Sequence, residues 1–242
     1  MRRPDDRFAP APDGLARPDP LAGGDGPGGL AGLVAAVATD LATRRDELNR
    51  LDGIAGDGDL GLTVSTAAAA LIELAPALAE LAEAEAIRRC GREVASKAPS
   101  TGGTLLAFAL MAAGKAEVAP DATPLERAAG YAEAAAASIE QRGGVQPGDR
   151  TMLDALVPAA RALRHAAERG ASPAEAVRDA AHAADDGARA TSLMAATVGR
   201  AGWLADRAKG HEDAGARLIA MAFAAAARHV GVMQQERARP PE

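Results

Sequence analysis

The 242-residue sequence has few aromatic side chains, a single cysteine and no strongly basic segment. Phe, Tyr and Trp together make up 2% of the residues, which disfavours a fold rich in β-strands. The lone Cys90 excludes a disulfide framework and is typical of a cytosolic protein. The formal net charge is -6, and no basic stripe with interleaved aromatics is present, so we expect no binding to nucleic acid.

Several other signals are missing. No apolar run reaches membrane-spanning length, and the N-terminal segment has no uninterrupted hydrophobic region of the secretory type. We therefore expect a cytoplasmic protein without membrane contact. Gly114-Lys115 is followed by Ala116 and has no earlier glycine at the required spacing, which excludes a Walker A phosphate loop.

What the sequence does contain favours helices. Hydrophobic residues make up 48% of the chain, and many of them are alanine, the best helix former. We predict an all-α domain over residues 30–235, between a disordered N-terminal tail at 1–29 and a polar tail at 236–242. Eight helices are expected, over about 30–51, 61–81 (kinked or broken at Pro76), 84–98, 103–117, 124–141 and 149–170, from 173 onward, and over 214–234.

Four glycine-rich or polar loops separate these helices, at residues 52–63, 99–104, 142–152 and 199–215. They follow the first, third, fifth and seventh helices. In an up-and-down bundle every second loop lies at the same end. The spacing therefore predicts that these four loops meet and form one site.

The first of these loops carries the clearest chemistry, because Asp52, Asp57 and Asp59 lie close together among glycines. Carboxylates this close repel one another unless a cation lies among them, and Asp oxygens suit Mg²⁺. A Mg²⁺ site that holds nucleotide phosphates explains both the acids and the glycines. The N-terminus of the following helix would offer N–H groups to the same phosphates.

The alternatives for this loop are weaker. Residues 56–61 match the G-x-G-x-x-G fingerprint, but that motif needs a preceding strand. An EF-hand is excluded because the twelfth position from Asp57 is Ala68 rather than Glu. A solvated acidic turn remains the simplest alternative.

The other loops each allow two interpretations. Ser100 and Thr101 either cap a helix or form a second nucleotide-binding loop. Arg200 and Asp213 either belong to a charged surface loop with an Asp cap or contact phosphate. His182, near Asp185 and Asp186, is assigned to a solvated helix face rather than to a metal site.

Taken in order, four segments resemble one family, the nucleotide-binding L subunit (DhaL type) of dihydroxyacetone kinase. Residues 51–61 resemble its acidic loop, and residues 142–156 (RGGVQPGDRTMLDAL) resemble its RG…PGDKTMLDAL segment. Residues 199–204 and 210–216 resemble its GRASYL and GHxDPGA motifs. The resemblance extends over about residues 30–235.

The resemblance implies an eight-helix antiparallel barrel that holds ADP or ATP and two Mg²⁺ ions at one end. Asp52, Asp57 and Asp59 would be the metal ligands, and together with Arg200 they would form the catalytic set. The nucleotide contacts carried over by position are Leu60, Gly61, Leu62, Thr63, Ser100, Thr101, Gly143, Met152, Arg200, Asp213, Ala214 and Gly215.

The function implied is that of a phosphotransferase, the glycerone (dihydroxyacetone) kinase L subunit of glycerol metabolism. It would supply the phosphoryl group to a keto-sugar that a partner K subunit holds. The donor is either exchangeable ATP or bound ADP rephosphorylated by a phosphocarrier of the phosphotransferase system. No region of this chain resembles the K subunit, so we expect activity only with that partner, and a homodimer is a further possible assembly.

Leu60 stands where the family has histidine, and residues 98–103 (APSTGG) replace its GGASG loop. The first difference keeps open a kinase for another acceptor, such as a tetrulose or an acyl group on a carrier protein. A nucleotide-sensing helical scaffold without catalysis is the alternative from a different class of protein.

Overall fold

The computed structural model describes residues 29–198, 202 and 205–238. The predicted tails therefore lie outside this part of the chain, apart from Gly29 and residues 236–238. No described residue is in a strand, which confirms the all-α prediction. In chain order the helices are α1 (Leu30–Ala42), α2 (Arg45–Ala55), α3 (Leu60–Leu78), α4 (Glu83–Lys97), α5 (Thr101–Ala113), α6 (Pro124–Gly143), α7 (Leu153–Glu168), α8 (Pro173–Ala190), the 3₁₀ helix η1 (Thr191–Leu193), α10 (Ala205–Ala208) and α11 (Ala214–Ala238).

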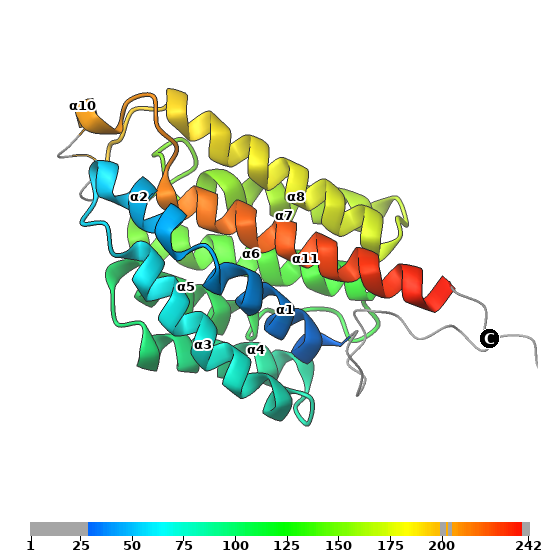
Figure 1. Ribbon diagram of the computed structural model, residues 1–242. Coiled ribbons are helices and arrows are strands. Elements are labelled where there is room, and N and C mark those ends of the chain that lie inside the picture. The colour runs from blue at the N-terminus through cyan, green and yellow to red at the C-terminus, as the bar shows by residue number, and fades with distance from the viewer. Residues whose placement is uncertain (1–28, 199–201, 203–204, 239–242) are drawn as a thin grey trace, which may run out of the picture.

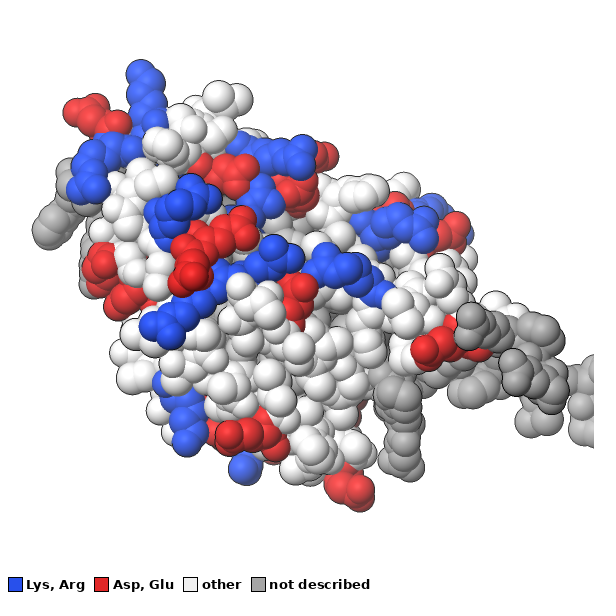
Figure 2. Space-filling view, viewed as in Figure 1, with Lys and Arg blue, Asp and Glu red and all other residues white. Residues whose placement is uncertain are grey.

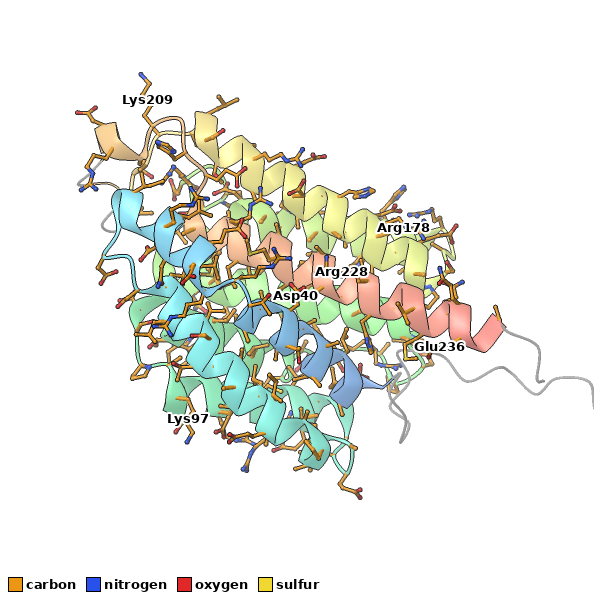
Figure 3. All side chains as sticks on the ribbon, in the orientation of Figure 1. Asp40, Lys97, Arg178, Lys209, Arg228 and Glu236 are labelled. Carbon is orange, nitrogen blue, oxygen red and sulfur yellow. The ribbon has the colours of Figure 1, made fainter. Side chains whose placement is uncertain are left out.

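Eight of these described helices form a closed ring. Starting from α1, each helix packs on the next in the order α3, α4, α5, α6, α7, α8 and α11, and α11 returns to α1 (Figure 1). The connections reverse the chain between neighbours, including the longer ones through α2 and through residues 191–213, so the ring is antiparallel, as predicted. An ion pair joins the first and last members, with Arg228 Nη2 of α11 2.7 Å from Asp40 Oδ1 of α1 (Figure 3).

Small side chains fill the largest part of the core. Ala129, Ala159, Ala176 and Ala180 are fully buried in one apolar cluster contributed by α5, α6, α7, α8 and α11. Glycine allows still closer approach, because a Cβ at Gly187 of α8 would lie 2.0 Å from the carbonyl oxygen of Asp154 in α7. The low aromatic content of the sequence therefore reflects helices that lie close together.

The prediction of one continuous helix over residues 30–51 is wrong, because the structure has two helices there. The chain turns at Thr43 and Arg44, where the Thr43 hydroxyl donates to the carbonyl of Asp40. A second helix, α2, then continues through Asp52 as far as Ala55. Asp52 is therefore a helical residue rather than a loop residue, and the acidic loop itself is shorter than predicted. The remaining ring helices match the predicted ones within a few residues at their ends.

Pro76 does not end its helix, which runs on to Leu78. At the other end of the sequence, α11 continues to Ala238, past the predicted end near residue 234. The segment 199–215, expected to be irregular, includes the short helix α10. A break at Pro76 and a helix end near residue 234 are therefore wrong, whereas a kink at Pro76 stays a prediction.

Two described helices, over Leu60–Leu78 and Ala214–Glu236, are long and apolar enough to cross a membrane by length and composition. The prediction that no apolar segment reaches this length is therefore wrong. Core helices of soluble proteins pass the same test, and both helices here belong to the ring. On the face shown in Figure 2, basic and acidic side chains are interspersed rather than separated.

The contact at Gly187 makes the packing testable. We expect Gly187→Ala to lower the free energy of unfolding by about 1–3 kcal/mol, because the new methyl group meets backbone that cannot rotate away. Gly231→Ala in α11 is the matched control, since no atom lies within 4 Å of a Cβ there. It should raise stability by about 0.5–1 kcal/mol. Urea unfolding of both variants checks this, and equal effects would contradict the packing described.

Candidate functional site

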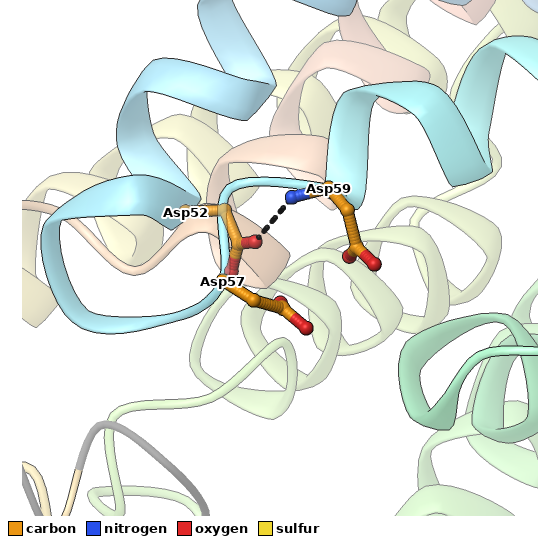
Figure 4. Close-up of side chains that lie close together, drawn as sticks. All are labelled: Asp52, Asp57 and Asp59. Carbon is orange, nitrogen blue, oxygen red and sulfur yellow. Dashed lines mark hydrogen bonds between the residues drawn. The ribbon is translucent and has the colours of Figure 1, made fainter.

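Three carboxylates converge where α2 ends and α3 begins. Each of Asp52, Asp57 and Asp59 offers an oxygen, and these oxygens all lie within 4.8 Å of one another (Figure 4). Asp52 is half-buried, whereas Asp57 and Asp59 are exposed. Hard oxygen donors at this separation suit a divalent cation such as Mg²⁺, so the donor set fits the metal inferred from the sequence.

Asp52 also shapes the loop that carries the other two acids. Its Oδ2 accepts hydrogen bonds from the N–H groups of Gly58 at 2.8 Å and Asp59 at 3.1 Å. Gly58 has φ +77°, a left-handed conformation that glycine adopts at little cost. A Cβ at Gly56 would lie 2.3 Å from Asp52 Oδ1, so only glycine fits there. One carboxylate oxygen thus folds the loop back onto α2.

The first turn of α3 follows directly. Its N–H groups mostly have partners within the chain: Leu60 donates to Asp52 at 3.4 Å, Leu62 to Asn49 Oδ1 at 3.2 Å, and Thr63 to the Asp59 carbonyl. A Cβ at Gly61 would lie 1.9 Å from the carbonyl oxygen of Arg45, so α2 and α3 touch here. Phosphate binding by these N–H groups requires Asp52 and Asn49 to share them.

The second loop caps α5. Ser100 Oγ accepts a hydrogen bond from the N–H of Gly103 at 3.0 Å, and Thr101 is the first residue of the helix. The N-cap interpretation of Ser100 is therefore confirmed. A Cβ at Gly102 would lie 3.8 Å from Leu60 Cδ1, which places this loop beside the acidic one.

The third loop, between α6 and α7, follows Gly143, the last residue of α6. It is organised by Asp154, whose carboxylate accepts hydrogen bonds from the N–H groups of Gly148 at 2.5 Å and Thr151 at 2.7 Å. Arg150 lies between these two donors, only 4% exposed and with φ +63°. Its Nη2 donates to the carbonyl oxygens of Ala208 at 3.2 Å and His211 at 2.9 Å, in the fourth loop.

The fourth loop ends at Asp213, which caps α11 through a hydrogen bond from the N–H of Ala216 at 2.7 Å. The Asp213 N–H donates to the hydroxyl of the fully buried Thr191. Burial of the Asp213 carboxyl raises its pKa to about 6, although the residue as a whole keeps some exposure. The positive charge of Arg150 lowers this pKa, whereas the negative charge of the Asp154 carboxylate raises it further.

The four loops meet at one end of the ring. Leu60 approaches Gly102, Arg207 of α10 donates to the carbonyl oxygen of Gly53 at 3.2 Å, and Arg150 bonds the fourth loop. Met152, the residue before α7, lies 3.5 Å from where a Cβ of Gly215 would stand, so it packs against the start of α11 at Ala214 and Gly215. Arg200, assigned to this site from sequence, lies outside the described residues.

Sequence reasoning missed four supporting residues: Asn49, Arg150, Asp154 and Thr191. Asn49 and Thr191 gave no signal, because single polar residues on helices are ordinarily solvated. Arg150 was quoted only as part of the segment 142–156, and its burial is evident only from the fold. Asp154 follows Thr151 by three residues, so a carboxylate returning to cap the preceding backbone could have been expected from spacing.

A closed ring of antiparallel helices that gathers three carboxylates and the start of a long helix at one end defines a class of helical domain. Such an end can hold a divalent cation together with an anionic ligand, because the acids attract the cation and helix N-termini attract anions. Comparison with known proteins identifies this class. Residues 54–228 match the DAK2 domain, and the chain belongs to that family.

Named relatives agree with this assignment. The chain is 31% identical over 179 residues to the "PEP-dependent dihydroxyacetone kinase, ADP-binding subunit DhaL" of Escherichia coli, covering 74% of this chain and 85% of that protein. It is 39% identical over 191 residues to the "D-erythrulose kinase" of Mycolicibacterium smegmatis, covering 77% of this chain. The chain spans about a third of the length of the latter, 32%.

A solved structure with the same fold is the dihydroxyacetone kinase of C. freundii in complex with AMP-PNP and Mg²⁺. The TM-score is 0.65 at 26% identity, and the match covers 93% of this chain and 38% of the other. The resemblance to the L subunit of dihydroxyacetone kinase is therefore confirmed, and the relatives that carry names are kinases.

The raised pKa of Asp213 gives a pH prediction. The folded state keeps a proton on this carboxyl up to a pKa of about 6, whereas its ordinary value is 3.8, so unfolding releases the proton between these pH values. Stability should therefore fall as pH rises from about 4 to 7, by roughly 2 kcal/mol relative to Asp213→Asn, which keeps an acceptor for the helix cap. Urea unfolding at several pH values checks this. Parallel pH profiles for the two proteins would contradict it.

Proposed function

We propose that this chain is the nucleotide-binding domain of a keto-sugar kinase, which holds ADP or ATP with Mg²⁺ and supplies the phosphoryl group. The observation that carries the proposal is the convergence of Asp52, Asp57 and Asp59 within 4.8 Å at the start of α3. The similar C. freundii kinase, in complex with AMP-PNP and Mg²⁺, supports it over 93% of this chain.

In this proposal the three aspartates hold two Mg²⁺ ions. Asp52 is fixed in place by the hydrogen bonds that its Oδ2 accepts from the N–H groups of Gly58 and Asp59. When bound, the ions neutralise the charge that develops on the transferred phosphoryl group. Arg200 adds positive charge in the same region. The nucleotide is held at the ring end by the other loop residues named above, from Leu60 and Ser100 to Met152 and Gly215.

The acceptor belongs to a partner. A K-type subunit holds the keto-sugar, as the DhaL relative suggests by being named a subunit. We further propose that a phosphocarrier of the phosphotransferase system rephosphorylates bound ADP, in keeping with a relative that is named PEP-dependent and ADP-binding. Dihydroxyacetone is one acceptor, and the 39% identity to a D-erythrulose kinase favours a tetrulose as the second candidate. We also propose a cytoplasmic location, as expected from the lone Cys90.

Nucleotide binding should depend on the acidic loop. ADP or ATP with Mg²⁺ at about 100 times the Kd should stabilise the native protein by about 2.7 kcal/mol, raising Tm by roughly 5–10 °C. Asp57→Asn should remove most of this shift, because it takes away a metal ligand. Thermal unfolding with and without Mg²⁺ is the measurement.

Asp121→Asn is the matched control, an exposed acid in the connection between α5 and α6 at the opposite end of the ring. It should keep the full Mg²⁺-dependent shift. If the Tm of the native protein shows no Mg²⁺-dependent shift with nucleotide, the nucleotide site is refuted, and the non-catalytic helical scaffold becomes the better interpretation. An equal Tm shift in the native protein and in Asp57→Asn would show that nucleotide binding does not depend on the acidic loop.

Catalysis should require the partner. The purified chain with ATP, Mg²⁺ and either dihydroxyacetone or erythrulose should form sugar phosphate at no more than about a thousandth of the rate reached with a K-type subunit, because positioning of the acceptor is lost. A coupled assay for ADP release, with each sugar in turn, is the measurement. Rapid turnover by the chain alone would overturn the subunit assignment, and the preferred sugar decides the acceptor.

A further inference from the structure

Arg150 is unusual among the described residues. It lies in the connection between α6 and α7, is only 4% exposed, and is the one non-glycine residue described with a positive φ, at +63°. Arginine is seldom buried without a partner, and side chains other than glycine rarely adopt this backbone conformation. Two unfavourable features at one residue indicate that the fold gains something from its position.

The gain is a connection between two loops. A single nitrogen, Nη2, donates to the carbonyl oxygens of Ala208 and His211, at 3.2 and 2.9 Å. These carbonyls flank the turn between α10 and Asp213. On its own side, Arg150 stands between Gly148 and Thr151, whose N–H groups are both held by Asp154. Asp154 thus fixes the backbone on either side of Arg150, and Nη2 of the Arg150 guanidinium binds the end of α10 and the turn that follows it.

The connection continues to the acidic loop. Arg207, in α10 and one residue before Ala208, donates to the carbonyl oxygen of Gly53 at 3.2 Å. Gly53 follows Asp52 directly, and Asp52 is the carboxylate that folds the loop carrying Asp57 and Asp59. A chain of hydrogen bonds therefore runs from Arg150 through α10 to the base of the carboxylate cluster.

Resting on the proposed function, we propose that Arg150 is a positioning residue that holds α10 against the acidic loop and so raises the affinity for Mg²⁺ with nucleotide. It does not touch the reacting atoms. It acts through the backbone of Ala208 and His211, and Arg207 transmits its effect to Gly53. The positive charge of Arg150 also attracts the nearby Asp213 carboxylate, at the start of α11.

The geometry specifies which substitution should rescue the function. Because both hydrogen bonds come from one nitrogen, the single ammonium of a lysine can make both. Arg150→Lys keeps the charge and a donor that is one bond shorter, which a small shift of the loop brings to the two carbonyl oxygens. Arg150→Gln is neutral, is two bonds shorter and keeps neither hydrogen bond. A role that rested only on filling space would be served by glutamine about as well as by lysine.

The experiment measures the Kd of ADP in Mg²⁺ by calorimetry on the full chain, below the Tm of every variant. Arg150→Gln should weaken binding about tenfold, the size expected for losing a charged hydrogen bond, and Arg150→Lys should stay within about threefold of the native protein. Arg207→Gln should weaken binding as well. Arg169→Gln, which breaks an exposed pair with Asp179 at the far end of the ring, is the control and should change nothing.

The double variant Arg150→Gln/Arg207→Gln tests the route through α10. If both arginines act through this helix, the double variant should bind about as weakly as the weaker single variant, rather than showing the product of both losses. Fully multiplicative losses would overturn the route. An unchanged Kd in Arg150→Gln, or a loss in Arg150→Lys equal to that in Arg150→Gln, would overturn the positioning role.

The experiment also distinguishes a failure of the positioning role from misfolding of Arg150→Gln and from a failure of the proposed function. If Arg150→Gln fails to fold, Arg207→Gln breaks the other end of the same connection at an exposed side chain, and an unchanged Kd there would refute the proposal. If the native chain itself binds no nucleotide in Mg²⁺, the proposed function fails. If the native chain binds nucleotide and neither arginine variant changes the Kd, only the positioning role is refuted and the proposed function stands.

Discussion

Close approach between helices is the constraint on which the structure depends. Alanines such as Ala129 and Ala180 are fully buried in the largest cluster, and Gly187 leaves room for the carbonyl oxygen of Asp154. Helices that touch through side chains this small can close into a ring of eight. Larger side chains at these positions would push the helices apart and open the ring. Ring closure in turn brings alternate loops to one end, which is where the site lies.

At that end, side chains bind backbone more often than they bind each other. Asp52, Asp154 and Ser100 each accept hydrogen bonds from N–H groups of their own loop, and Arg150 donates to carbonyls of another. Such bonds fix loop conformation where no regular structure does. The exposed Asp57 and Asp59 therefore stand on a frame that is itself ordered. An acidic turn without this frame would let mutual repulsion spread the carboxylates apart.

Much of this was accessible from sequence, and particular residues show why the rest was not. Alanine-rich periodicity located eight ring helices, and Pro124 and Pro173 marked the starts of α6 and α8. The break at Thr43 and Arg44 was missed because apolar periodicity continues across it and neither residue is a strong helix breaker. Asp52 was placed in a loop because Gly53 and Gly56 follow it, yet packing of α2 on α3 keeps Asp52 helical. Tertiary contact outweighed the local preference of glycine.

The sequence by itself determined the fold class, the number of ring helices, the cluster of three aspartates and the family, because each depends on local pattern or on motifs in order. The tertiary structure decided how these parts support one another. Only the fold shows that Arg150 is buried and reaches Ala208 and His211, about sixty positions further along the chain. Only the fold shows that Asn49 and Asp52 already bind the first N–H groups of α3. Such contacts join segments distant in sequence, and their partners are set by ring closure rather than by any local preference.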